Sequence, residues 1–278
     1  MEVTASSIKT YQTCQRKYWY SYELLLKLKE ERQYLSDGRY IHSFLSRYYT
    51  NKSFEGVLLP EINSANSAML CGLLEGYAKI YKPDEFNLYI PEKKFEMKFG
   101  EDVLMGVRDA VVRDLSGNLF FLEYKSTKGS LTKLSEQLGT DIQNLIYFLA
   151  TYLEIGEIPT GIIYRCLKKS SLRLRKSESE EEFYNRIRRD YFERPEAYFY
   201  QFKLYKSYTD IAWLRQEISQ LLCEMKVKKE IWVRNLQRCH DFGGCEFIPL
   251  CQKQELDDGL LKNFYDRKES KHEEIVSS

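Results

Sequence analysis

The chain has 278 residues, which is enough to bury one large hydrophobic core or two smaller ones. Hydrophobic residues make up 43% of it and charged residues 30%, an ordinary globular balance. Its 42 basic and 41 acidic residues leave a net charge of +1, which excludes a protein that coats nucleic acid through a uniformly basic surface. The first seven residues are polar, and no apolar run reaches the roughly 18 residues of a membrane span. We therefore expect a soluble, cytoplasmic protein without a membrane partner.

The first part of the chain predicts a helical lead-in followed by a strand-rich block. Helical spacing predicts helices over residues 6–34, 40–49 and 64–81. Ser36-Asp37-Gly38 is predicted to separate the first helix from the second. Strand patterns follow over residues 88–99, 103–112 and 119–123, with the turn signal Ser116-Gly117-Asn118 before the last of them.

The second part alternates predicted helices with predicted strands. The helices are expected over residues 133–153, 177–192 and 208–233. The strands between them are expected over residues 160–167 and 198–205. This order of elements predicts an α/β fold with helical additions at both ends. Residues 252–278 are polar and charged, and we expect a disordered tail there.

Two acidic residues and a lysine form the most informative pattern. Asp109 ends one predicted strand, and Glu123-Tyr124-Lys125 ends the next strand across a turn. Neighbouring strands would bring Asp109 and Glu123 together, and alternation places Glu123 and Lys125 on one face. Converging carboxylates can hold Mg²⁺ or Mn²⁺, beside which a lysine supplies positive charge for a phosphate or a nucleophile. The plainer interpretation is that these charges pair or face water, but a buried strand that delivers them at its end favours a site.

The pattern resembles the PD-(D/E)XK nuclease superfamily, and more narrowly its RecB-like branch, which includes AddB-type nuclease domains and the CRISPR adaptation exonucleases. Gly38-Arg39-Tyr40-Ile41-His42 is similar to the early Gly-x-x-x-His element of that branch. Gln143-Asn144-Leu145-Ile146-Tyr147 is similar to its Gln-x-x-x-Tyr helix. One departure is Arg108, which stands where the family often has an apolar residue.

The resemblance implies a fold and roles for individual residues. The fold would be a restriction-endonuclease-like central mixed sheet flanked by helices. His42, Asp109 and Glu123 would bind the metal ion with the backbone carbonyl of Tyr124, and Lys125 would orient or activate the attacking water. Gln143 and Tyr147 would line the DNA-binding site. A single nuclease domain would span residues 1–251, with a lead-in over 1–85, a core over 86–205, and a long helix and cysteine clip over 206–251.

Four of the seven cysteines form a candidate metal site. Cys239, Cys245 and Cys251 are each separated by five residues, and Cys14 precedes them by more than 200 positions. Three late cysteines and one early cysteine resemble the clip of the AddB-type nucleases, in which four thiolates hold a [4Fe–4S] cluster. The family often has two residues between the first pair of the late cysteines, so the five found here could instead indicate structural Zn²⁺, with His240 as a substitute ligand. Cys71, Cys166 and Cys223 lie in apolar patterns and are predicted to be buried.

Two basic stretches could line a groove for a phosphate backbone, although a solvated charged face is an equally good interpretation of each. The first stretch contains Arg165, Lys168, Lys169, Arg173, Arg175 and Lys176. The second stretch contains Lys226, Lys228, Lys229, Arg234 and Arg238.

The resemblance implies a DNA exonuclease that acts on single strands or ends during repair, recombination or processing, in a bacterial, archaeal or phage setting. No phosphate-binding loop of the Walker type is present, so a helicase or recombination partner would have to supply any ATP hydrolysis. A noncatalytic DNA-binding or assembly module that keeps the fold and the cluster is the alternative. A redox protein is a third and weaker hypothesis.

Overall fold

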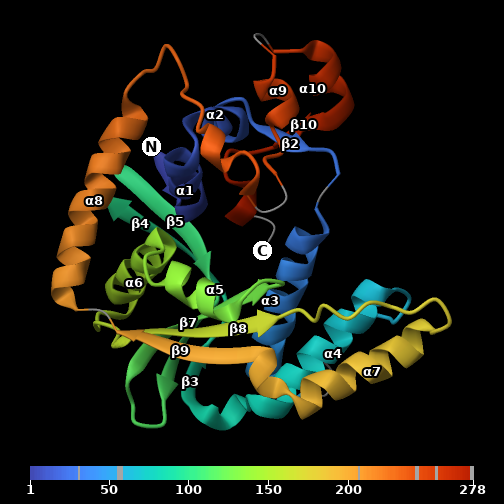
Figure 1. Ribbon diagram of the computed structural model, residues 1–278. Helices are drawn as coiled ribbons and strands as arrows, with labels where there is room; N and C mark the ends of the chain where they lie inside the picture. Colours follow the sequence, from blue (N-terminus) through green and yellow to red (C-terminus); the bar gives the residue numbers. More distant parts are fainter. Residues whose placement is uncertain (31, 55–58, 206, 242–243, 254–255, 276–278) are drawn as a thin grey trace. The chain divides into compact units, whose positions relative to one another are not determined.

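A computed structural model describes the chain except for residues 31, 55–58, 206, 242–243, 254–255 and 276–278. The chain forms two compact units, each built from separate stretches (Figure 1). Unit 1 consists of Met1–Arg32, Lys94–Gly106 and Ile211–Ser278, and unit 2 of Gln33–Lys93 and Val107–Asp210. The single domain over residues 1–251, with divisions at residues 85 and 205, stays a prediction.

Unit 2 is built on a five-stranded mixed sheet in the order β3-β6-β7-β8-β9. Its strands are β3 (Phe86–Ile90), β6 (Ala110–Asp114), β7 (Leu119–Thr127), β8 (Gly161–Lys168) and β9 (Phe199–Tyr205). β7 and β8 run parallel, whereas the other neighbours are antiparallel. With the helices that flank it, this sheet confirms the predicted α/β fold class.

The two central strands are apolar runs that are buried along their length. The first six residues of β7 and the first seven of β8 are buried, as expected for strands covered on both faces. The turn that precedes β7 contains Gly117, whose φ of 85° a glycine adopts without steric cost. At the start of β8, a Cβ on Gly161 would lie 2.3 Å from the backbone oxygen of Leu204, so only glycine fits beside β9.

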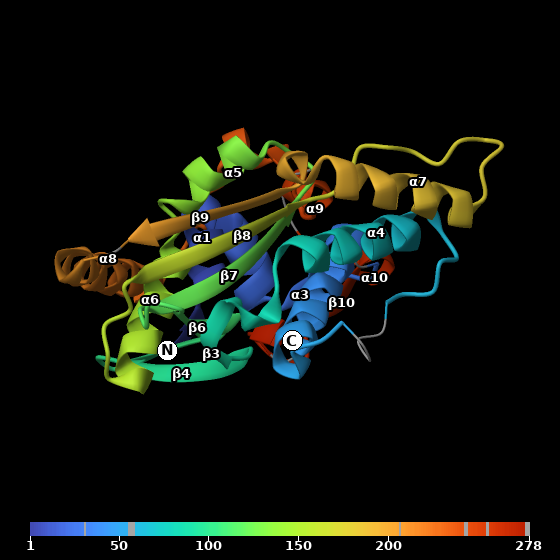
Figure 2. The ribbon, with the colours of Figure 1, turned by 90° about the horizontal axis from the view of Figure 1, so that it is seen from below.

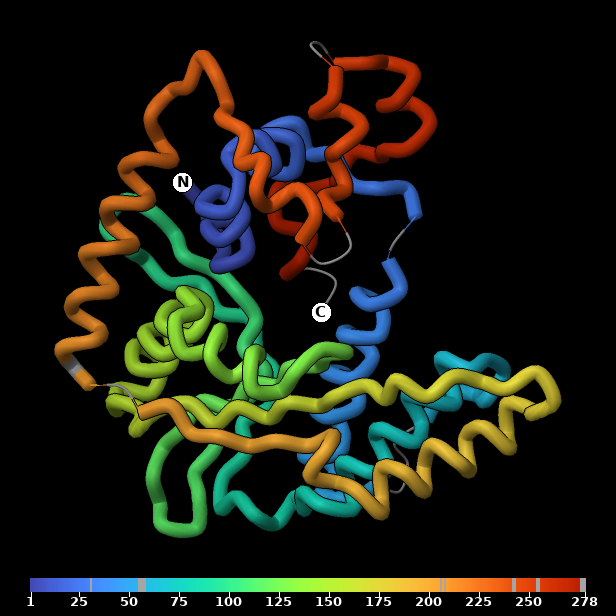
Figure 3. The backbone as a smooth tube through the Cα atoms, viewed as in Figure 1, coloured from blue at the N-terminus to red at the C-terminus, as the bar shows by residue number. Residues whose placement is uncertain are grey.

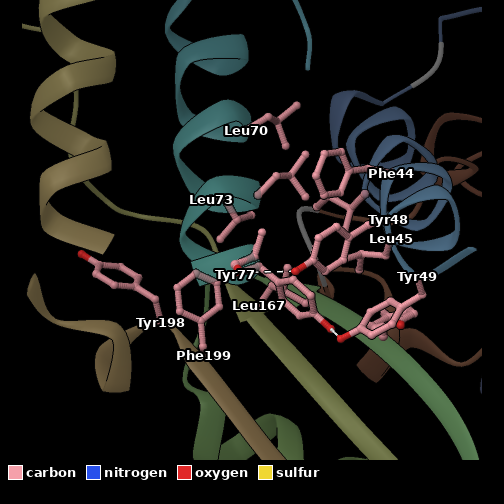
Figure 4. Close-up of a cluster of buried hydrophobic side chains, with 14 of the residues drawn as sticks. Phe44, Leu45, Tyr48, Tyr49, Leu70, Leu73, Tyr77, Leu167, Tyr198 and Phe199 are labelled. Atoms are coloured by element: carbon pink, nitrogen blue, oxygen red, sulfur yellow. Dashed lines mark hydrogen bonds between the residues drawn. The ribbon is translucent and has the colours of Figure 1, made fainter. Parts of the chain in front are cut away.

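Three helices pack on one face of this sheet and enclose the main core. They are α3 (Gln33–Asn51), α4 (Ala65–Ile80) and α7 (Glu180–Glu193). Figure 2 shows α4 and α7 side by side. Phe44 and Tyr48 of α3 meet Leu73 and Tyr77 of α4 above Leu167 of β8, as Figure 4 shows.

The connection between β7 and β8 carries two helices, α5 (Leu131–Leu138) and α6 (Ile142–Ile155). The sequence predicts one helix here over 133–153. Asp141 interrupts it, because its backbone is extended and its side chain caps the N–H of Gln143. On the face of β7 that Phe121 occupies, α6 packs through Tyr147, whose ring lies 5.5 Å from that of Phe121.

Other predicted boundaries also change. The predicted break at residues 36–38 is wrong, because α3 continues through it with Asp37 buried. The predicted helix over 6–34 is wrong as one element, since the backbone of Cys14 is extended at φ −164° and ψ 113°. In its place are β1 (Glu2–Thr4), α1 (Ala5–Thr13), α2 (Gln15–Tyr18), a π-helical turn (Trp19–Glu23) and β2 (Leu26–Leu28).

Unit 1 contains a small three-stranded sheet in the order β1-β5-β4. β4 is Lys93–Phe99 and β5 is Asp102–Arg108, and each has an end residue or two in unit 2. The long helix α8 (Tyr208–Lys226) ends seven residues earlier than predicted. In the described part of the chain, no helix is both long enough and apolar enough to cross a membrane.

The segment after residue 251 differs from the disordered tail that its composition predicts. Its described residues include α10 (Asp258–Phe264) and β10 (Tyr265–Arg267), and β10 pairs with β2. Figure 3 shows this C-terminal chain beside the N-terminal chain. Tyr265 is buried against Phe247 of the cysteine-bearing segment, with ring centroids 5.6 Å apart. Burial of Tyr265 within unit 1 therefore anchors this otherwise polar segment.

Candidate active site

Asp109 lies at the bend between β5 and β6, and its carboxylate is held from two sides. Nδ1 of His42, on α3, lies 2.7 Å from Oδ1 of Asp109. The backbone N–H of Tyr124, on β7, donates to Oδ2 over 2.8 Å. Asp109 is thus fixed against the strand that carries Glu-x-Lys, as the pairing of β6 with β7 requires.

Glu123 and Lys125 lie on the same face of β7, because alternate residues of a strand point the same way. Nζ of Lys125 donates to Oε1 of Glu123. The same oxygen accepts a 3.0 Å hydrogen bond from Nε2 of Gln143 at the start of α6. The predicted residues His42, Asp109, Glu123, Lys125 and Gln143 therefore come together in unit 2.

The two carboxylates are buried and influence each other. Burial, with the nearby charge of Asp109, raises the pKa of Glu123 to about 7. Burial opposes the charged form of Asp109 as well, but His42, Lys125 and the N–H of Tyr124 together outweigh burial and lower the pKa of Asp109. The side chain of Lys125 is 25% exposed, whereas the side chains of both acids are enclosed. The site thus places two acids, with Lys125 and His42 beside them, where water screens charge poorly.

The donor set matches the chemistry of a hard divalent cation, although no three His, Cys, Asp or Glu side chains among the described residues are arranged to hold a metal ion as they stand. Oε2 of Glu123 is buried, and none of the described residues donates a hydrogen bond to it. A buried carboxylate oxygen without a donor is costly, and a cation satisfies it. Carboxylates of Asp109 and Glu123 are the ligands that Mg²⁺ and Mn²⁺ prefer.

Tyr147, predicted to line a DNA-binding surface, is 7% exposed. Its ring packs on Phe121 on the strand that carries Glu123. Gln143 and Tyr147 lie one turn apart on α6 and flank the same stretch of β7. The helix face that bears them is therefore turned toward the acidic site.

The four candidate cluster cysteines all belong to unit 1. Sγ of Cys14 accepts a 3.4 Å hydrogen bond from the N–H of Asn235, four residues before Cys239. Burial raises the pKa of Cys251, and Cys14 and Cys239 raise it further. Burial also raises the pKa of Cys245, with a smaller contribution from Cys251. The N–H of Cys245 donates to the backbone oxygen of Cys239 over 2.7 Å, and Cys245 and Cys251 both pack against the apolar cluster that contains Tyr20 and Phe247.

The first basic stretch is only partly available to a ligand. Arg165 is 1% exposed and pairs with Glu85, and Lys169 is 4% exposed and pairs with Asp37. The prediction that Arg165 and Lys169 line a groove for a phosphate backbone is therefore wrong. The prediction that Cys223 is buried is also wrong, because Cys223 is exposed on α8, whereas Cys71 and Cys166 are buried as predicted.

Residues 2–252 match the family described as the PD-(D/E)XK nuclease superfamily. The chain belongs to this superfamily. The match covers far more than half of the chain and includes every residue of the acidic site and all four cluster cysteines. No curated protein is similar enough in sequence to count as a match.

Two solved structures are similar to this PD-(D/E)XK protein. One is provisionally described as an exonuclease of Eubacterium rectale, with 11% identity, coverage of 94% of this chain and 92% of that chain, and a TM-score of 0.49. The other is the protein SSO0001, with 14% identity, coverage of 86% and 82%, and a TM-score of 0.39.

Arg108, Thr151 and Glu154 of this PD-(D/E)XK chain lie near the site but belong to no motif, and the sequence predicts no role for them. Arg108 precedes Asp109 and is 1% exposed, and it contacts Thr151 and Glu154 at the far end of α6. The one signal in the sequence is the charge of Arg108 itself, which directly follows the apolar residues 103–107. A buried arginine needs partners, but the sequence does not say which ones.

Proposed function

We propose that this nuclease is a Mg²⁺- or Mn²⁺-dependent deoxyribonuclease that hydrolyses phosphodiester bonds. The observation that supports it best is the placement of Asp109 against β7, beside Glu123 and Lys125. Action as an exonuclease on single-stranded DNA or DNA ends, in repair, recombination or processing, rests on the resemblance to the RecB-like branch. A helicase or recombination partner is proposed on the same ground.

His42, Asp109 and Glu123 are the side chains that would hold the ion, together with the backbone carbonyl of Tyr124. When bound, a divalent ion lowers the pKa of its water ligand and neutralises charge on the scissile phosphate. The buried Oε2 of Glu123, for which the described residues provide no donor, supports this assignment. The two acids also repel each other, and a bound cation would reduce that repulsion.

Lys125 supplies the positive charge beside the reacting phosphate. Its ammonium group is held by Oε1 of Glu123, which suits a group that orients water and stabilises an anionic transition state. Gln143 donates to the same carboxylate and keeps Glu123 in place. We propose that Gln143 and Tyr147 also contact the DNA strand.

We propose in addition that Cys14, Cys239, Cys245 and Cys251 hold a structural [4Fe–4S] cluster. Four thiolates are the ligand set that such a cluster requires, and all four of these cysteines belong to unit 1. Zn²⁺ is the other candidate, since His240 is adjacent in sequence to Cys239 and could replace one thiol. Either group would tie the start of the chain to its end and reduce the entropy of the unfolded chain.

Metal removal tests the proposed activity. The protein is treated with a chelator, desalted, and incubated with DNA labelled at either end, alone or with Mg²⁺, Mn²⁺ or Ca²⁺. We expect cleavage only with Mg²⁺ or Mn²⁺, and faster cleavage of single-stranded than of duplex DNA. Parallel reactions with RNA define the substrate class. DNA binding without cleavage under every metal condition would instead favour the noncatalytic module.

A further inference from the structure

Arg108 is the last residue of β5 and directly precedes Asp109, yet its side chain is only 1% exposed. Guanidinium groups are almost never fully buried unless several partners satisfy them. This one does not point to the acids. Instead it reaches the last turns of α6, whose first turn carries Gln143.

The contacts of Arg108 form a continuous chain to the site helix. Nη1 donates to Oγ1 of Thr151 over 3.3 Å, and Nη2 pairs with Oε2 of Glu154. Oγ1 of Thr151 in turn donates to the backbone oxygen of Tyr147 over 2.8 Å. Lys93 pairs with the second oxygen of Glu154, so this carboxylate binds two cations.

These ion pairs keep Glu154 charged. Burial alone would favour its neutral form, but hydrogen bonds from Lys93 and Arg108 outweigh burial and lower the pKa of Glu154. The side chain of Glu154 is 32% exposed and that of Lys93 is 57% exposed, so Arg108 is the enclosed member of the group. The enclosed contact is the one least weakened by solvent.

Helix α6 is thus held at both ends by the segments that carry the acids. Gln143 binds Glu123 at its first turn, and Thr151 and Glu154 bind Arg108, next to Asp109, at its last turns. We propose that Arg108 is a positioning residue that fixes α6 relative to Asp109 and so holds Gln143 and Tyr147 beside Glu123. The proposal rests on the proposed nuclease function, and it concerns a position where the family often has an apolar residue.

A double-mutant cycle separates positioning from a purely structural role. Arg108→Met is made in the wild type and in a protein that lacks the site groups of α6, Gln143→Ala with Tyr147→Phe. If Arg108 acts through α6, Arg108→Met should lower kcat/KM on single-stranded DNA about 10- to 100-fold in the wild type. In the second background, Arg108→Met should lower kcat/KM less than about threefold, because the side chains that Arg108 positions are already absent.

A loss by the same factor in both backgrounds would overturn the proposal, since a general loss of folded protein is insensitive to Gln143 and Tyr147. Arg165→Met is the matched control, because Arg165 is equally buried and pairs with a carboxylate on the opposite face of the sheet. Arg165→Met should lower kcat/KM by the same factor in both backgrounds. If Arg108→Met does not fold, Thr151→Val replaces it, because that change breaks the link to Tyr147 without leaving a buried charge unpaired.

Hydrogen exchange gives a second readout that does not depend on cleavage. Arg108→Met should speed amide exchange in α6 several-fold while that of α4 stays as in the wild type. Unchanged exchange in α6 would overturn the proposal even if activity fell. If the wild type itself cleaves no DNA, the nuclease function fails, and the exchange experiment still decides whether Arg108 fixes α6.

Discussion

The backbone N–H of Tyr124 donates a 2.8 Å hydrogen bond to Oδ2 of Asp109. This bond links the bend after β5 to β7 and holds the carboxylate of Asp109 beside the residue that follows Glu123. Its geometry needs only an oxygen acceptor at position 109.

Asp109→Asn should therefore leave the fold intact. An asparagine oxygen accepts the same hydrogen bond. The change gives up the charge that His42 stabilises, but it also removes one of two buried carboxylates that repel each other. We expect the melting temperature of the metal-free variant to stay within about 4 °C of the wild type, equivalent to about 1 kcal/mol or less in a chain of this size. A larger drop in a thermal melt would show that the Asp109 charge is needed for folding, through His42.

A second buried pair, Asp37 with Lys169, should make stability depend on acid pH. Burial opposes the charge of Asp37, but hydrogen bonds from Lys169, Gln33 and Asn66 outweigh it and lower the pKa of Asp37. The folded value thus lies below the unfolded value of about 3.9. The pair stabilises the protein fully above that pH, and the contribution is lost as pH falls through the folded pKa.

Asp37→Asn should lower the free energy of unfolding by about 3 kcal/mol at pH 7, because it leaves Lys169 buried without a counter-charge. Urea denaturation at several pH values checks this. The difference between the variant and the wild type should shrink below about pH 4. The double variant Asp37→Leu with Lys169→Met is the control, and it should recover most of the loss. A difference that stays constant from pH 7 to pH 3 would contradict the account.

Much of the acidic site could be predicted because it depends on local periodicity. A strand turns alternate residues to one face, so Glu123 and Lys125 had to share a side, and a hairpin-like connection had to return Asp109 to them. His42 and Gln143 came from the resemblance alone, since nothing in their local sequence says that α3 and α6 meet the end of β7.

The features that the sequence does not predict depend on contacts with residues far away in the chain. Arg165 and Lys169 look like surface cations, but Glu85 and Asp37 pair with them in the interior. The break at Cys14 cannot be read from helical spacing, because the amphipathic pattern continues through it. The order of the C-terminal segment depends on a few apolar residues, chiefly Tyr265 with Leu260 and Leu261, which pack in the cluster that contains Phe247 of another segment.

The thiols give a test that is independent of DNA. Protein purified without oxygen should be brown and contain about four iron atoms per chain if Cys14, Cys239, Cys245 and Cys251 hold the cluster. Cys251→Ser should lose the colour and unfold at a lower temperature. Cys223→Ser is the control, because Cys223 is exposed on α8 and outside the proposed set. Colourless protein with one zinc per chain would replace the iron assignment by zinc.

The central claim is that Asp109, Glu123 and Lys125 act together in hydrolysis of DNA. The most direct measurement is the rate of single-stranded DNA cleavage with Mg²⁺ or Mn²⁺ by the wild type, Asp109→Ala, Lys125→Ala and the control Lys128→Ala, which changes an exposed lysine just beyond β7. We predict that the first two variants lose at least about 100-fold in kcat, since each removes a group that stabilises the transition state. Lys128→Ala should cleave at the wild-type rate. Equal cleavage by all four proteins would show that the activity does not come from this site and would contradict the account.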